Sequence, residues 1–109
     1  MTVDISTRGN AAVAHLSGEV DLERSPGVRR ALLDALGRRM PLVVDLSQVS
    51  YIDSSGIASL VEAYQTARKQ STPFILCAVS AAALRVMQLA RLDKVFDIRP
   101  TLDDALAAV

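Results

Sequence analysis

The sequence predicts a single α/β domain over residues 1–109, with a mixed, mostly parallel sheet of about five strands packed against about four helices. Its length of 109 residues fits one compact domain. Hydrophobic residues make up 50% of the chain, which is enough to form a core without a metal or a disulfide. Two strand-like segments open the chain, and helical and strand-like segments alternate after them, which is the pattern of a sheet covered by helices.

The first half of the chain predicts two strands, a helix and a third strand, which are "TVDIST", "AAVAHLSG", "SPGVRRALLDALGRRM" and "PLVVDLS". The turn "RGN" joins the first two strands, which should form a hairpin. In the helix, Ser25 is expected as the N-cap, Pro26 at the first position and Gly37 as the terminator. The third strand is an apolar run suited to burial on both faces.

The second half predicts three helices that alternate with two strands. Apolar residues from Ile57 to Tyr64 recur at helical spacing, so a helix should run on to about Gln70. The remaining elements are, in order, the buried strand "PFILCAV", the helix "SAAALRVMQLARLDKV", the edge strand "FDIR" and the helix "PTLDDALAAV". Ser80 is expected to cap the first of these two helices, and Thr101 and Asp104 are spaced like a capping box at the second.

Charge and cysteine content narrow the class of protein. Lysine plus arginine and aspartate plus glutamate number 12 each, and this balance argues against a nucleic-acid-binding module, which normally carries a basic excess. Cys77 is the single cysteine and lies in a segment predicted to be buried, so we expect a reducing compartment. The sequence shows neither a secretory signal nor an apolar segment of membrane-spanning length, and we expect a cytoplasmic protein without membrane insertion.

No set of residues predicts catalysis. A serine hydrolase needs a histidine base near its nucleophile, and the only histidine, His15, lies in a predicted strand where a structural role is expected. No Cys/His cluster suggests zinc, and no phosphate-binding loop suggests a nucleotide. Asp45 and Asp53 both lie near the C-terminal end of the third strand, where capping of a loop is favoured over a metal site. We therefore predict that the protein is not an enzyme and uses no metal or other cofactor.

The stretch "YIDSSGIASLVEAY" places two serines and a glycine between a buried strand and an amphipathic helix. Open α/β sheets carry their functional groups at such junctions. The start of the helix also offers unpaired N–H groups and a partial positive charge, so an anion on a nearby serine would be tolerated. The alternative is that the aspartate and serines are ordinary helix caps, worth about 1 kcal/mol.

Three segments of the chain resemble a known family. "LSGEVDLERSP" resembles the glycine-containing loop after the second strand of STAS domains, and "LVVDLSQVSYIDSSGIASL" resembles their strand, D-S-[ST]-G motif and helix. "PFILCAVSAAALRVMQLARLDKVFDI" is similar to the following strand and helix of the bacterial anti-sigma factor antagonists. The resemblance covers the chain from Val3 to Leu106.

This resemblance implies a partner-switching protein. In that family the unphosphorylated antagonist binds an anti-sigma factor that is also a serine kinase, and the complex is lost when the kinase phosphorylates the first serine after the aspartate. That residue is Ser54 here, and Ser55 is the second choice. A PP2C-type phosphatase would restore the binding form. The partner-binding residues that the resemblance implies are Gly18, Glu19, Asp21, Asp53, Ser54, Ser55, Gly56 and Ile57.

Two other classes of protein stay open. STAS domains also serve as regulatory subunits of membrane transporters, in which case this chain would bind the transporter ATPase. A small-ligand-binding or enzymatic α/β domain would need a deep polar pocket near Asp45 and Ser54. Co-purification with a transporter ATPase would favour the first of these alternatives.

Two surfaces also have two interpretations each. The first helix has a basic side formed by Arg29, Arg30, Arg38 and Arg39, which is either solvated or in contact with an acidic partner or a phosphate. The segment "ALRVMQLARL" is more apolar than one buried stripe requires. It either makes ordinary core contacts or forms an exposed patch at the partner interface.

Overall fold

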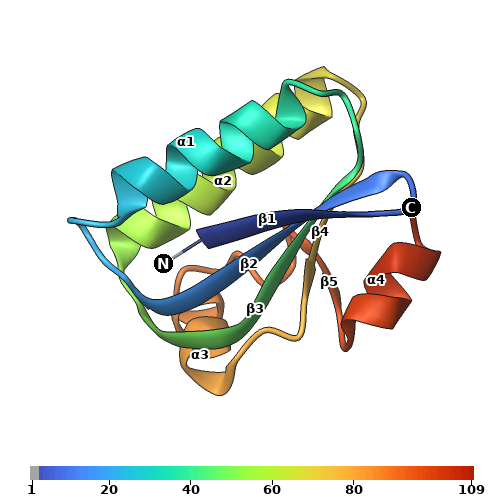
Figure 1. Ribbon diagram of the computed structural model, residues 1–109. Coiled ribbons are helices and arrows are strands. Elements are labelled where there is room, and N and C mark those ends of the chain that lie inside the picture. Colours follow the sequence, from blue (N-terminus) through green and yellow to red (C-terminus); the bar gives the residue numbers. More distant parts are fainter. Residues whose placement is uncertain (1–2) are drawn as a thin grey trace.

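The computed structural model describes residues 3–109, which form a sheet flanked by helices (Figure 1). The strands are β1 (Val3–Arg8), β2 (Ala11–Val20), β3 (Leu42–Ile52), β4 (Phe74–Cys77) and β5 (Asp97–Arg99), in the spatial order β1-β2-β3-β4-β5. The helices are α1 (Ser25–Leu36), α2 (Ser54–Lys69), α3 (Ala81–Leu89) and α4 (Leu102–Ala107). β1 is antiparallel to β2 and the other neighbouring strands are parallel, so the predicted fold class and element order are confirmed.

The central strands bury side chains on both faces, which explains their nearly continuous apolar runs. One face carries Ala12, Ala14, Leu16, Leu42, Val44, Leu46 and Leu76, and it belongs to the same core as the buried residues Leu32, Leu36 and Leu60 of α1 and α2. The other face carries Ala11, Val13, Val43, Ile75 and Cys77, which pack with Ala105 of α4. In Figure 1, α1 and α2 lie side by side over the first face.

β2 and β3 run further than the sequence pattern predicts, and this extension positions the site described below. The predicted second strand ended at Gly18, whereas β2 continues to Val20, and β3 runs to Ile52. The parallel ladder between the two strands is irregular after His15 and again after Gly18. Such irregularities break the alternation of side chains by which strands are predicted, so the sequence pattern stopped too early.

The start of α1 differs from the prediction. Ser25 is its first residue and not its N-cap, which is Arg24, a residue whose side chain makes no capping hydrogen bond. The Ser25 backbone N–H donates to the carbonyl oxygen of Asp21 at 2.8 Å, and the Ser25 hydroxyl donates to the same oxygen. Ser25 is 5% exposed, so its hydroxyl is used inside the fold. Pro26 is therefore the second helical residue and not the first as predicted, while Gly37 ends the helix as its C-cap, as predicted.

The starts of α3 and α4 follow local rules, and their caps were predicted correctly. Ser80 and Thr101 cap these helices with hydroxyl oxygens that accept from backbone N–H groups three residues further on. α3 is shorter than predicted: it ends at Leu89, and Arg91 then adopts a left-handed conformation with φ of 60°. A left-handed residue just after a helix commonly ends it. No helix within residues 3–109 is long and apolar enough to cross a bilayer.

Candidate functional site

The C-terminal ends of β2 and β3 bring two segments together that are distant in the sequence. Val20 pairs with Ile52 in the parallel ladder, and the Asp53 backbone N–H donates to the Val20 carbonyl oxygen at 3.3 Å. α1 and α2 begin soon after these ends and lie side by side, so their N-termini are at the same edge of the sheet (Figure 1). The two parts of the predicted site, Gly18 to Asp21 and Asp53 to Gly56, are therefore neighbours in the fold.

Asp53 is the N-cap of α2. Its carboxylate accepts from the backbone N–H groups of Ser55 and Gly56 at 3.0 and 3.1 Å, and from the Ser55 hydroxyl at 2.5 Å. These hydrogen bonds, above all that of the Ser55 hydroxyl, lower the pKa of Asp53 below its usual value because they favour the charged form. Asp53 is therefore ionised at neutral pH and fixes the first turn of α2.

The two serines of the D-S-S-G motif have different surroundings. Ser54 is exposed as the first residue of α2, and its side chain makes no hydrogen bond to any residue of the described part of the chain. Ser55 is half-buried, and its hydroxyl oxygen contacts both Asp53 and, at 2.8 Å, the hydroxyl oxygen of Ser25. The fold thus engages the second serine and leaves the first one accessible from outside.

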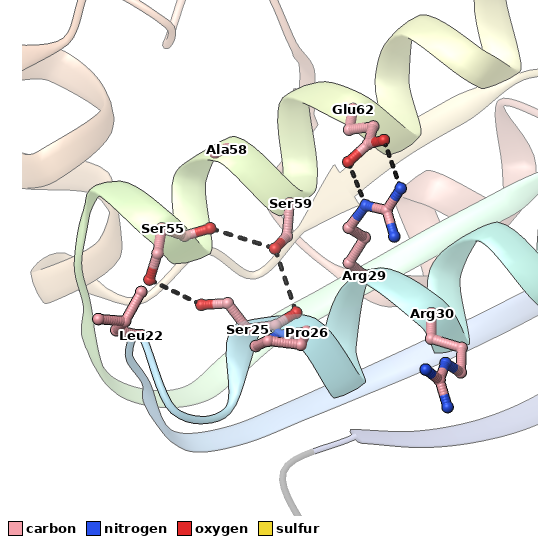
Figure 2. A pocket seen from close by; sticks show the side chains of 9 residues that line it. All are labelled: Leu22, Ser25, Pro26, Arg29, Arg30, Ser55, Ala58, Ser59 and Glu62. Carbon is pink, nitrogen blue, oxygen red and sulfur yellow. Dashed lines mark hydrogen bonds and ion pairs between the residues drawn. The ribbon is translucent and has the colours of Figure 1, made fainter.

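Ser25, Ser55 and Ser59 form a hydrogen-bonded group between α1 and α2 (Figure 2). Ser59 is 4% exposed, and its hydroxyl lies 3.1 Å from the Ser55 carbonyl oxygen and 3.3 Å from that of Ser25. A hydroxyl has a single proton, so Ser25 and Ser55 have two protons for three contacts, which are with the Asp21 carbonyl, with the Asp53 carboxylate and with each other. Ser25 and Ser59 were not predicted as part of this site, because only the packing of α1 against α2 brings them to Ser55.

A pocket of about 310 Å³ opens beside this group of serines, between α1 and α2 (Figure 2). Arg29 and Glu62 form an ion pair across it, with 2.8 Å between Arg29 Nη2 and Glu62 Oε1. The hydrogen bond from Arg29 lowers the pKa of Glu62 below its usual value. Of the four arginines predicted to form a basic side of the first helix, Arg29 is therefore paired with a carboxylate of α2, while Arg38 and Arg39 lie beyond the end of α1 at Leu36.

Gly56 and Ile57 are buried, contrary to the expectation that they contact a partner. Ile57 is 7% exposed. A Cβ atom at Gly56 would lie 2.6 Å from Cγ1 of Ile52 and 2.7 Å from the carbonyl oxygen of Val20. The first turn of α2 therefore packs directly on the ends of β2 and β3, and there is no room for a larger residue. These two positions support the site from the core side.

The β2 end of the site is more accessible. Gly18 and Glu19 are exposed, and Gly18 has φ of 72°, in the left-handed region that favours glycine. Asp21 is half-buried, and its carboxylate accepts from the Arg24 backbone N–H and pairs with the Arg24 guanidinium, both at 3.0 Å. Gly18 and Glu19 pair with Val49 and Tyr51 of β3, so this end of β2 runs beside the strand that leads into the D-S-S-G motif.

Asp45 lies in the middle of β3, because the strand runs on to Ile52, and not at its end as predicted. Its carboxylate contacts Nδ1 of His15 at 2.9 Å and accepts from the Ser47 backbone N–H at 2.9 Å. Burial opposes ionisation of Asp45, but these hydrogen bonds outweigh it and lower the pKa. Among the described residues, no group of three or more histidine, cysteine or acidic side chains is placed to hold a metal ion.

Cys77 is buried, as the sequence predicts. In the parallel pairing of β3 with β4 it lies opposite Asp45. Burial, together with the negative charge of Asp45, raises the pKa of the Cys77 thiol to about 11. The cysteine is therefore a protonated core residue on the face of the sheet that α4 covers.

The protein is an α/β domain with a mixed five-stranded sheet and a D-S-S-G motif at the start of α2. The family model described as STAS domain matches residues 2–105. The chain therefore belongs to the STAS domain family, in agreement with the resemblance of its motifs.

The relatives of the chain within this family include anti-sigma factor antagonists. The anti-sigma-F factor antagonist RsfB of Mycobacterium tuberculosis is 32% identical over 112 residues, covering 100% of this chain and 89% of RsfB. The crystal structure of an anti-sigma factor antagonist from Mycobacterium paratuberculosis has a TM-score of 0.90 and 36% identity, covering 99% of this chain and 92% of that one. SpoIIAA of Bacillus in its phosphorylated form has a TM-score of 0.76, covers 97% of each chain and, at 18% identity, shows the fold.

Proposed function

We propose that this protein is an anti-sigma factor antagonist that binds an anti-sigma factor with serine kinase activity, and that phosphorylation of Ser54 ends this binding. The observation that carries the proposal is the exposed Ser54 side chain at the start of α2, in a chain similar to proteins named anti-sigma factor antagonists. In this role the protein is a substrate of its partner kinase and no enzyme itself. A PP2C-type phosphatase returns it to the binding form.

The contacts of the two serines favour Ser54 as the phosphoacceptor. A kinase must reach the serine oxygen and remove its proton, and Ser54 has neither a protein partner nor cover in the described chain. The Ser55 proton is directed at Asp53, and its oxygen lies 2.8 Å from that of Ser25. Phosphorylation of Ser55 would break both contacts, so we keep it as the second choice only.

The electrostatics of the site support a switch that leaves the fold intact. A phosphate adds roughly −1.5 to −2 charge, which the N-terminus of α2 tolerates. At a partner interface the same phosphate would sit beside the ionised Asp53 and would need to be desolvated. A loss of about 2.7 kcal/mol of binding free energy weakens a complex roughly a hundredfold.

The proposed partner surface is smaller than the set of residues that the resemblance implied. It comprises Gly18, Glu19, Asp21, Asp53, Ser54 and Ser55, which are exposed or half-buried around the two strand ends. Gly56 and Ile57 hold this surface in place from the core.

The experiment that tests the proposal is the phosphorylation state of the protein recovered from its own cells. Intact mass and site mapping would be performed with the phosphatase disabled, on the wild type and on the Ser54→Ala and Ser55→Ala variants. We expect one phosphate on the wild type and on Ser55→Ala, and none on Ser54→Ala. Persistent absence of phosphate with an active kinase would contradict the proposal and favour a constitutively binding STAS subunit, such as that of a transporter.

A further inference from the structure

The pocket between α1 and α2 has an apolar rim above a floor of serines (Figure 2). Leu22, Pro26 and Ala58 line it and are all exposed, and Leu22 is 75% exposed. The floor is formed by Ser25, Ser55 and Ser59. Exposed apolar groups around a preformed pocket offer contact area to an apolar side chain of a partner.

The floor of the pocket is poorly suited to a small polar ligand. The three hydroxyl protons of its serines are used in contacts within the protein, which are with the Asp21 carbonyl, the Asp53 carboxylate, one another and the carbonyl oxygens of Ser25 and Ser55. No buried side-chain nitrogen or oxygen within residues 3–109 lacks a hydrogen-bond partner. A phosphate or nucleotide would therefore find no free hydroxyl donor here, whereas an apolar group needs none.

The charged residues that line the pocket indicate whether a partner should place an acidic or a basic residue beside it. Arg29 and Glu62 neutralise each other. Arg30 is the remaining charged residue of the lining, and no ion pair joins it to a carboxylate of the described chain. The lining thus carries one uncompensated positive charge, which an acidic residue of a partner would match.

We propose that this pocket receives an apolar side chain of the anti-sigma factor, with an acidic residue of the same partner segment placed against Arg30. The proposal rests on the function proposed above and extends its surface from the D-S-S-G motif onto α1. Ser55 belongs to both the motif and the pocket floor, so the pocket is lined by the residue that follows Ser54 in the sequence. A phosphate on Ser54 would then act directly on the edge of the occupied pocket.

The test is the affinity of pocket variants for the purified serine-kinase anti-sigma factors encoded in the same genome, measured by titration calorimetry. Leu22→Ala removes the rim leucine, Arg30→Glu reverses the charge, and Ala58→Arg covers the pocket from the exposed side of α2. Their matched controls are Leu89→Ala at an exposed leucine of α3, Arg38→Glu just beyond the C-terminal end of α1, and Gln65→Arg two helical turns along α2. Circular dichroism and thermal unfolding would confirm that all six variants fold.

We expect the pocket variants to bind the factor about tenfold or more weakly, and the controls to stay within about twofold of the wild type. Pocket variants with wild-type affinity would overturn the inference while leaving the proposed function in place. Weakening by Leu89→Ala alone would place the interface on α3 and overturn it as well. If sedimentation shows that the wild type forms a dimer and that Leu22→Ala is monomeric, the pocket is occupied by a second copy of this chain and the inference is wrong. Binding of no factor by the wild type would instead refute the proposed function itself.

Discussion

The hydroxyl oxygens of Ser25 and Ser55 lie 2.8 Å apart and join the first turn of α1 to the first turn of α2. The contact links two residues that are 30 positions apart in the chain. On one side it continues to the Asp21 carbonyl at the end of β2, and on the other to the Asp53 carboxylate at the end of β3. Both helix starts and both strand ends of the site are therefore held by one chain of polar contacts.

Ser25→Ala should destabilise the protein, because it removes the central member of this chain of contacts from a buried position. The expected loss is about 1 kcal/mol of the free energy of unfolding, the usual net contribution of one hydrogen bond. Urea denaturation would measure it. Ser54→Ala is the matched control, since that serine is exposed, and its change should stay within about 0.5 kcal/mol. Equal stability of the two variants would mean that the contact between the helices contributes nothing.

Gly56→Ala should destabilise the protein, although alanine is the better helix former. Its Cβ atom would lie 2.6 Å from a side-chain carbon of Ile52 and 2.7 Å from the backbone oxygen of Val20, so α2 would have to shift away from the sheet. Overpacking of this kind costs about 1–3 kcal/mol. At Gly27 in α1, a Cβ atom would have no neighbour within 4 Å, and Gly27→Ala should stabilise by about 0.4–1 kcal/mol. Thermal unfolding of the two variants would show opposite shifts, and a gain in stability for Gly56→Ala would contradict the close packing.

These contacts also mark what the sequence can predict and what it cannot. The caps Ser80 and Thr101 were predictable because each hydroxyl accepts from an N–H only three residues away. The D-S-S-G motif was placed correctly because a strand pattern precedes it and a helix pattern follows it. The contact of Ser25 with Ser55 was not predictable, since it depends on how two helices pack on the sheet.

The ends of β2 and β3 were missed for a related reason. Their ladder is irregular after His15 and after Gly18, and the side chains no longer alternate in the way that reveals a strand. Burial of Gly56 was missed as well, because a sequence motif does not show whether its glycine faces a partner or the core. The environment of Gly56 in α2 follows from the close approach of Val20, which is the last residue of β2.

Asp53→Asn should make the free energy of unfolding depend less on pH in the acidic range. The folded pKa of Asp53 is lowered, so its contribution to stability is present above the unfolded value of about 3.9 and is lost as the pH falls through the folded value. The wild type should therefore lose more stability than Asp53→Asn as the pH falls below about 5. Denaturation at a series of pH values would measure the difference. Asp34→Asn, at an exposed position of α1, is the charge-matched control, and identical profiles for wild type and Asp53→Asn would contradict the role assigned to the cap.

Cys77 should be inert in the folded protein. Its thiol is buried and has a pKa of about 11, so very little thiolate forms at neutral pH and what forms is covered. Iodoacetamide at about pH 7.5 should label the native protein far more slowly than the urea-unfolded chain, at a rate limited by opening of the fold. Labelling at the rate of the unfolded chain would show that the face under α4 opens readily.

Ser54→Asp should separate the stability of the domain from its affinity for the partner. A negative charge at the first residue of α2 interacts favourably with the helix N-terminus, by about 0.3–1 kcal/mol, and this gain opposes the repulsion from Asp53. We therefore expect the melting temperature of Ser54→Asp to stay close to that of the wild type, while its affinity for the anti-sigma factor falls by about a hundredfold. Ser54→Asn, which adds similar bulk without charge, is the matched control and should keep most of the affinity. If Ser54→Asn loses as much affinity as Ser54→Asp, size at this position matters and charge does not. If Ser54→Asp melts far below the wild type, the switch would act by unfolding α2, which is a different mechanism from repulsion at an intact surface.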